Sequence, residues 1–223
     1  MKEKVCLVIP AYNEVGSLEG VVKEASRYSD TIIVVDDGSR DKTGDFCIEK
    51  NEKDVYFLRH VVNLGKGAAM RTGAIFAQNL KCDFLVFMDA DGQHDPQDIK
   101  KLVDCVKEKK GLAIGKREKN KNMPLAMKVG NFSLSLLIKT LFKLSVEDTQ
   151  SGFRAIRLED LDKILWTSCD YNVETEMLIK AKKNQISIFE VPIKTVYNDK
   201  YKGTTFIDGI KIFLQLLKLR FYD

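Results

Sequence analysis

Residues 84–94 read Phe-Leu-Val-Phe-Met-Asp-Ala-Asp-Gly-Gln-His, an apolar run that passes directly into a polar turn. The run predicts a buried strand, and the turn places Asp89 and Asp91 one residue apart at the exposed end of that strand. Carboxylate oxygens in this arrangement suit Mg²⁺ or Mn²⁺, which can also bind a diphosphate. Taken alone, the pair is explained equally well as aspartates that cap a turn.

Two other kinds of acidic site do not fit this stretch. An EF-hand calcium loop that begins at Asp89 requires glycine at its sixth position and glutamate at its twelfth, where the chain has His94 and Lys100. A phosphotransferase with an aspartate nucleophile would carry its acidic pair after the first strand of the chain. Residues 84–88 form the fourth predicted strand, which excludes that class.

The first half of the chain repeats the same pattern of strand, polar turn and amphipathic stretch. Strands are predicted at residues 5–10, 31–36, 55–61, 84–88 and 112–115, and helices at 17–28, 42–51, 67–79 and 96–109. This alternation predicts an α/β fold with an open, mostly parallel central sheet flanked by helices. Ligands of such sheets bind beyond the carboxyl ends of the strands, so the polar turns should meet in one crevice.

The second half is less regular. We expect a long helix over 123–146 that is interrupted at 130–135, a strand at 151–157, a helix at 173–184, a strand at 186–191 and a terminal helix at 206–221. No linker separates the halves, so residues 1–223 are predicted to form one domain.

Composition narrows the function. A net charge of +4, with 44% hydrophobic and 30% charged residues, is typical of an ordinary globular protein and too weakly basic to indicate a nucleic-acid partner. The five cysteines are odd in number, widely spaced and without a C-x-x-C pair, which predicts neither a disulfide framework nor a zinc site. With no leader and no run of about 20 apolar residues, a cytoplasmic location is expected.

Two further turns carry candidate ligand-binding groups. Asp36-Asp37-Gly38-Ser39 follows an apolar strand, and its carboxylates could bond a base or ribose, or form an Asx turn or helix cap. The turn at 63–67 places Lys66 at the start of a helix, where phosphates bind well. The sequence contains no Walker loop and no G-x-G-x-x-G motif after the first strand, so it offers no evident phosphate-binding loop for a nicotinamide dinucleotide.

The ordered set of motifs at 10–14, 35–39, 63–67, 88–94 and 148–154 resembles the family 2 glycosyltransferases. Within that family it is similar to the dolichol-phosphate mannose synthase and polyprenyl-phosphate glycosyltransferase branch, over residues 5 to about 206. The resemblance implies a GT-A fold, a nucleotide-sugar donor, a divalent cation, Mg²⁺ or Mn²⁺, and an inverting mechanism. It divides the domain into a nucleotide-sugar-binding half (1–115), an acceptor-side half (116–205) and a C-terminal amphipathic helix (206–223).

The resemblance also implies residue roles. The residues that would line the base and ribose are Pro10, Tyr12, Glu14, Val35 and Asp37. Those that would surround the metal and diphosphate are Asp89, Ala90, Asp91 and Gln93, with Asp89, Asp91 and Gln93 as metal ligands. Arg117 matches a basic residue that contacts phosphate, and Lys66 suits the same role. Residues 150–154 would face the acceptor, and Glu176 matches a carboxylate near that region.

The predicted reaction moves a hexose, mannose or glucose, from a donor of the GDP-mannose or UDP-glucose type to a polyprenyl or dolichyl phosphate. We expect Asp91 and Arg117 to act on the leaving diphosphate. A phosphate monoester acceptor is already an oxyanion at pH 7, because its second pKa is about 6, and needs no general base. A sugar hydroxyl acceptor would need one, for which Asp148 is the candidate.

Departures from the family pattern keep an alternative open. Met127 stands where relatives often have arginine, and Thr204 and Thr205 replace a Ser-Lys pair. A non-catalytic nucleotide-sugar-binding module would tolerate both changes; a nucleotidyltransferase ranks lower because no glycine- and lysine-rich loop follows the first strand. The apolar face of helix 206–221 fits either the inner surface of the cell membrane, as a peripheral contact, or the protein core.

Overall fold

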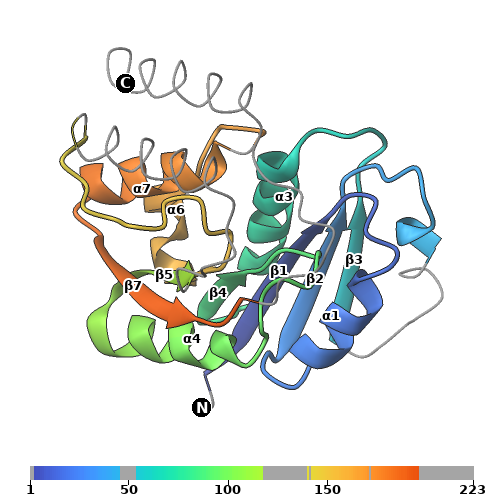
Figure 1. The fold of residues 1–223 in the computed structure, drawn as a ribbon, viewed down its shortest axis with the longest axis horizontal. Coiled ribbons are helices and arrows are strands. Elements are labelled where there is room, and N and C mark those ends of the chain that lie inside the picture. Colours follow the sequence, from blue (N-terminus) through green and yellow to red (C-terminus); the bar gives the residue numbers. More distant parts are fainter. Residues whose placement is uncertain (1–2, 46–53, 118–139, 141, 171, 196–223) are drawn as a thin grey trace.

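The computed structural model describes residues 3–45, 54–117, 140, 142–170 and 172–195 (Figure 1). In this part of the chain one sheet has the strand order β3-β2-β1-β4-β6-β5-β7. The strands are β1 (Val5–Ala11), β2 (Thr31–Asp36), β3 (Val55–Arg59), β4 (Phe84–Phe87), β5 (Gly111–Arg117), β6 (Arg154–Arg157) and β7 (Ser187–Ile193). The helices are α1 (Leu18–Ala25), α3 (Lys66–Gln78), α4 (Asp98–Lys109), α6 (Leu161–Ile164) and α7 (Val173–Lys183), with a 3₁₀ turn at Leu158–Asp160.

The sheet is parallel except at β6. Strands β1 to β4 pair in parallel, and β6 runs antiparallel between β4 and β5, so that β5 points the same way as β4. The carboxyl ends of β1, β2, β4 and β5 therefore lie at the same end of the sheet, which we call its carboxyl edge. Strand β6 begins at this edge, because its first residue, Arg154, pairs with both Phe87 and Ile114. The predicted α/β fold with a mostly parallel sheet is confirmed.

Helices cover both faces of the sheet (Figure 1). In β1, Cys6 and Val8 face a core that includes the apolar sides of α3, α6 and α7. Leu7 and Ile9 face the opposite core, beneath α1 and α4. Because both faces are buried, the central strands read as continuous apolar runs rather than as alternating ones. None of the helices in the described ranges is long and apolar enough to cross a membrane.

Several predicted boundaries need correction. The end of the predicted helix 123–146 is wrong: residues 143–146 are not helical, and Lys143 has a φ of 53° that a continuing helix does not allow. The short helical segments over 158–164 were not predicted, because they are too brief to show a period. Residues 43–45 of the predicted helix 42–51 are helical. Positions 46–51 and 123–139, including Met127, and everything from 196 on, including Thr204, Thr205 and the terminal helix, lie outside the described residues.

The cysteine prediction is also wrong for one pair. Cys6 and Cys82 are joined as a disulfide, with Cα atoms 5.9 Å apart and a separation of 76 positions along the chain. Cys6 lies in β1 and Cys82 precedes β4, which is the neighbouring strand of the sheet. Spacing along the chain cannot reveal such a pair, because only the strand order brings the two residues together.

Arg154 is fully buried at the start of β6, and its guanidinium donates to three main-chain oxygens of the described residues. Its Nε donates to Ser151 O at 2.8 Å, Nη1 to Glu174 O at 2.6 Å and Nη2 to Thr149 O at 2.8 Å. Burial lowers the pKa of this guanidinium to about 10, although the charges of Glu174, Asp148 and Asp89 oppose that change. Arg154 thus ties the loop at 149–152 to the first turn of α7.

Replacing Arg154 by methionine should lower the free energy of unfolding by about 3 kcal/mol, since three buried carbonyl groups lose their donors. Urea unfolding followed by circular dichroism measures this loss. Arg27→Met is the control, because Arg27 forms an exposed ion pair with Glu24 and its loss should cost less than about 1 kcal/mol. Equal stability of the two variants would contradict the anchoring role of Arg154.

Candidate active site

The turn after β4 brings Asp89 into contact with Lys66 of α3 and with His94 further along the same loop. Lys66, the first residue of α3, places its Nζ 2.6 Å from Asp89 Oδ1. His94 Nε2 lies 3.5 Å from Asp89 Oδ2. Lys66 and Asp89 were singled out separately in the sequence, and the structure places them together at the carboxyl edge of the sheet.

Glu174 is a site residue that the sequence reasoning missed. Its Oε1 lies 2.9 Å from Lys66 Nζ, and its side chain, in the first turn of α7, is 3% exposed. Glu176, which was expected near the acceptor, accepts hydrogen bonds from the main-chain N–H groups of Thr167 and Ser168 and holds the segment before α7. The two glutamates are two positions apart on one helix and therefore point in different directions.

The charges in this cluster depend on one another. Burial alone would lower the pKa of Lys66, but Asp89 and Glu174 outweigh it and raise that pKa above its usual value. Burial would raise the pKa of Asp89, but Lys66 and His94 hold it well below its usual range. Burial raises the pKa of Asp91, and the negative charge of Asp89 raises it further. Asp91 is therefore a carboxylate whose ionised form an added cation would stabilise.

The donor set fits a metal ion that keeps part of its coordination shell for water and substrate. Asp91 Oδ1 accepts a hydrogen bond from the Gln93 N–H at 3.0 Å, and both side chains are partly exposed. Ala90 between the carboxylates is buried in the core and fixes the turn. Across the described ranges no three His, Cys, Asp or Glu residues group closely enough to enclose a metal. Mg²⁺ and Mn²⁺ suit such a site, since they commonly bind one or two carboxylates together with phosphates and water.

Gly152 lies directly against Asp89 and Lys66. A Cβ atom added to Gly152 would be 2.6 Å from Asp89 Oδ2 and 2.8 Å from Lys66 Nζ. The loop at 149–152 that Arg154 anchors therefore lies directly against the Asp89 carboxylate. In the same loop, Gln150 Nε2 donates to Thr175 Oγ1 at 3.0 Å, which joins the loop to α7.

Arg117 and Asp148 form a two-bonded ion pair near this edge. Arg117 Nε donates to Asp148 Oδ2 and Nη2 donates to Oδ1, both at 2.8 Å. The side chains are 17% and 13% exposed. To act as a general base, Asp148 would have to accept a proton at an oxygen that already accepts a bond from Arg117.

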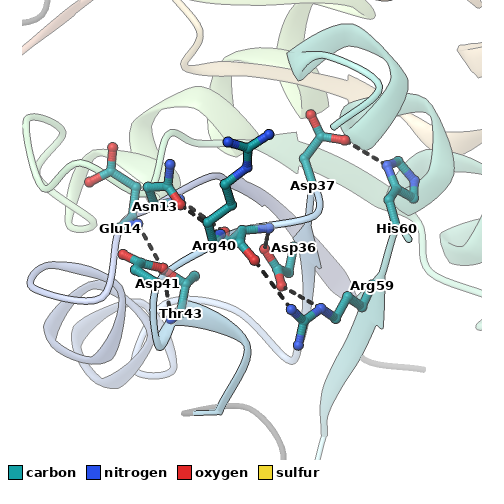
Figure 2. A network of polar contacts seen from close by, with 10 residues as sticks. Asn13, Glu14, Asp36, Asp37, Arg40, Asp41, Thr43, Arg59 and His60 are labelled. Atoms are coloured by element: carbon teal, nitrogen blue, oxygen red, sulfur yellow. Dashed lines mark hydrogen bonds and ion pairs between the residues drawn. The ribbon is translucent and has the colours of Figure 1, made fainter. Parts of the chain in front are cut away.

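Asp37, which directly follows β2, contacts His60 (Figure 2) and the loop that carries Lys66. Its carboxylate accepts hydrogen bonds from the N–H groups of Leu64 at 2.9 Å and Gly65 at 2.8 Å. His60 Nδ1 lies 2.7 Å from Asp37 Oδ1, and His60 Nε2 lies 3.0 Å from Thr72 Oγ1. His60 was not expected here; it directly follows β3 and reaches the carboxylate from the neighbouring strand.

The remaining nucleotide-side candidates differ in exposure. Tyr12 is 38% exposed in the turn after β1, and Glu14 is partly buried beside Thr43, whose hydroxyl accepts its main-chain N–H (Figure 2). Pro10 pairs with Val35 across β1 and β2, and the Val35 side chain is fully buried in the core. Tyr12, Glu14 and Pro10 thus lie at or near the surface of this edge, whereas Val35 lies beneath it.

Comparison with known proteins agrees with this arrangement. The chain matches the model of Glycosyl transferase family 2 over residues 6–165. It is 39% identical over 241 residues to the UDP-N-acetylglucosamine-dolichyl-phosphate N-acetylglucosaminyltransferase of Methanococcus voltae, covering 97% of this chain and 96% of that protein. It is 33% identical over 207 residues to the undecaprenyl-phosphate mannosyltransferase of Micrococcus luteus, covering 86% of this chain and 84% of that protein.

A solved structure shows the same fold at low sequence identity. Glucosyl-3-phosphoglycerate synthase from Mycobacterium tuberculosis, in complex with Mn²⁺, UDP-glucose and phosphoglyceric acid, superimposes with a TM-score of 0.77 at 20% identity, over 98% of this chain and 79% of that one. The family match and the two relatives confirm the resemblance seen in the motifs. The chain therefore belongs to glycosyl transferase family 2 and is a glycosyltransferase with the GT-A fold.

Proposed function

We propose that this chain transfers a sugar from a nucleoside-diphosphate donor to a polyprenyl phosphate, with inversion and with the help of Mg²⁺ or Mn²⁺. The observation that carries the proposal is the cluster of Lys66, Asp89 and Asp91 at the carboxyl edge of the sheet. The M. voltae and M. luteus relatives are named for dolichyl-phosphate and undecaprenyl-phosphate acceptors, and the M. tuberculosis structure contains Mn²⁺ with a nucleotide sugar. These names support the same chemistry here.

Several site residues would together stabilise the nucleoside diphosphate as it leaves the sugar. Asp89, Asp91 and Gln93 would hold the metal, which supplies positive charge to the leaving diphosphate. Lys66 and Arg117 add fixed cations where negative charge grows in the transition state, and this differential stabilisation lowers the barrier. Tyr12, Glu14 and Pro10 would border the base and ribose. Val35 would support that pocket from the core, and Asp37 would act through the Leu64–Gly65 main chain that it binds.

The ion pair between Asp148 and Arg117 favours a phosphate acceptor over a sugar hydroxyl. A hydroxyl must lose its proton to a base, but both oxygens of Asp148 accept bonds from Arg117. A phosphate monoester is largely ionised at pH 7 and attacks without a base. In this proposal Asp148 orients Arg117 toward the phosphates, and residues 116–205 form the acceptor side of the single domain.

The relatives add a further candidate for the transferred sugar to those expected from the sequence. Mannose or glucose from GDP-mannose or UDP-glucose was expected, and the relative at 39% identity is named for N-acetylglucosamine. UDP-N-acetylglucosamine therefore joins the candidate donors. Because the acceptor is a lipid, we place the reaction at the cytoplasmic surface of the cell membrane, with the chain as a peripheral protein.

The test is a transfer assay with the purified chain, vesicles that contain polyprenyl phosphate, and each of the three labelled donors. We expect one donor to give label in the lipid phase with Mn²⁺ or Mg²⁺, and EDTA to abolish that label. Vesicles without polyprenyl phosphate are the control. Donor binding without transfer to any vesicle would support a binding-only module instead, and transfer that persists in EDTA would contradict the metal site.

A further inference from the structure

The Lys66 ammonium lies between two carboxylates from distant parts of the chain. It is 2.6 Å from Asp89 Oδ1 and 2.9 Å from Glu174 Oε1, and the Lys66 side chain is 18% exposed. Asp89 belongs to the candidate metal site, whereas Glu174 comes from the first turn of α7. One cation thus joins the metal-binding turn to the acceptor-side half.

A divalent ion bound at Asp89 would compete with this ammonium. Both cations are attracted to the same carboxylate, and at a separation of a few ångströms they repel each other strongly in a partly buried site. Binding of the ion to either oxygen of Asp89 therefore displaces Lys66 from that carboxylate or weakens the contact between them. The cost of this exchange depends on whether Lys66 retains another anionic partner.

Glu174 has the features of such a partner. The residue is 2% exposed, and its Oε2 atom is buried with no hydrogen-bond partner among the residues that the structure describes. A buried acceptor without a donor destabilises the fold, and a neutral or apolar side chain would avoid that cost. Among the described residues, the side chain of Glu174 forms an ion pair with Lys66, and its charge also favours the ionised form of the buried Arg154 guanidinium. The charge of Glu174 is therefore directed at these two cations, of which Lys66 is the one in direct contact with the carboxylate.

We propose that Glu174 is a positioning residue that retains the Lys66 ammonium when a divalent ion binds Asp89, so that metal and lysine can both be present for the substrate's phosphates. The inference rests on the proposed metal site. It assigns to Glu174 no contact with the substrate: Glu174 acts through Lys66, and its effect on metal binding depends on the presence of that lysine.

The experiment measures the affinity of the purified chain for Mn²⁺ alone by electron paramagnetic resonance, without donor or acceptor. Lys66→Met removes the competing cation and should bind Mn²⁺ at least about fivefold more tightly than the wild type. Glu174→Gln leaves the ammonium with Asp89 as its remaining carboxylate and should bind Mn²⁺ at least about fivefold more weakly. If Lys66 and Glu174 only supported the fold, their replacements would not shift the Mn²⁺ affinity in opposite directions.

Two further variants test whether Glu174 acts by holding Lys66 or only by adding a negative charge near the metal. In the double variant Lys66→Met with Glu174→Gln, the second change should have almost no effect, because the lysine through which Glu174 acts is gone. Glu174→Asp keeps the charge but is one methylene shorter, so it should weaken Mn²⁺ binding as Glu174→Gln does. Equal effects of Glu174→Gln with and without Lys66, or wild-type affinity in Glu174→Asp, would overturn the proposal.

Matched controls come from α1, where Lys23→Met and Glu24→Gln remove the same charges far from the site and should leave Mn²⁺ affinity unchanged. Thermal unfolding of every variant confirms that the protein measured is folded. If neither the wild type nor Lys66→Met binds Mn²⁺, the proposed metal-dependent function is contradicted as well. If both bind but the Glu174 variants fail the tests above, only the role of Glu174 is lost.

Discussion

Replacing Asp91 by asparagine is expected to reduce the rate of sugar transfer by about a thousandfold, equivalent to about 4 kcal/mol of transition-state stabilisation. Asp91 is partly exposed, and its ionised form is disfavoured by burial and by the charge of Asp89, both of which a bound cation would offset. Asparagine keeps the shape and the acceptor oxygen for the Gln93 N–H but removes the charge that attracts the metal. Steady-state kinetics with the active donor and polyprenyl phosphate measure the loss.

The matched control is Asp95→Asn in the same turn. Asp95 Oδ1 accepts the N–H of Gln97 at 3.0 Å, a bond that an amide oxygen can also accept. This variant should retain activity within about twofold of the wild type. If Asp91→Asn were as active as Asp95→Asn, Asp91 would not be a metal ligand, and the assigned role of the turn would be wrong.

Replacing Gly152 by alanine should lower kcat/KM by about a hundredfold while leaving the fold nearly as stable as before. The new methyl group would lie 2.6 Å from Asp89 Oδ2 and 2.8 Å from Lys66 Nζ. Both atoms are at the ends of side chains, so they can move aside without unfolding the protein. Their displacement would disturb the carboxylate and the cation that the reaction needs.

The control for this prediction is Gly20→Ala. Gly20 lies in α1, and an added Cβ atom would meet nothing within 4 Å. Activity should be unchanged, and stability should rise slightly, because alanine favours a helix by about 1 kcal/mol over glycine. Full activity in Gly152→Ala would show that Asp89 and Lys66 tolerate displacement, which contradicts the proposed geometry.

The first half of the fold was predictable because its signals are local. Apolar runs such as 31–36 and 84–88, each followed by a polar turn, correspond to β2 and β4 within one residue. Their parallel pairing then places Asp37, Lys66 and Asp89 at one edge, as the strand-end rule for such sheets predicts. The antiparallel strand β6 does not disturb this outcome, because β5 still runs in the same direction as β4.

The missed features depend on contacts between distant segments. Glu174 could not be told from Glu176 by residue type, and only the orientation of α7 directs one toward Lys66 and the other toward Thr167 and Ser168. No motif in the sequence indicates that His60 contacts Asp37. The Cys6–Cys82 pair likewise depends on the pairing of β1 with β4.

The most direct test of the metal site is a crystal structure of the chain with Mn²⁺ and the nucleoside diphosphate of its active donor, with anomalous diffraction to locate the metal. We predict one strong anomalous peak within coordination distance of a carboxylate oxygen of Asp91, next to the bound diphosphate. A diphosphate bound at this edge without manganese beside Asp91, or manganese bound elsewhere, would contradict the account.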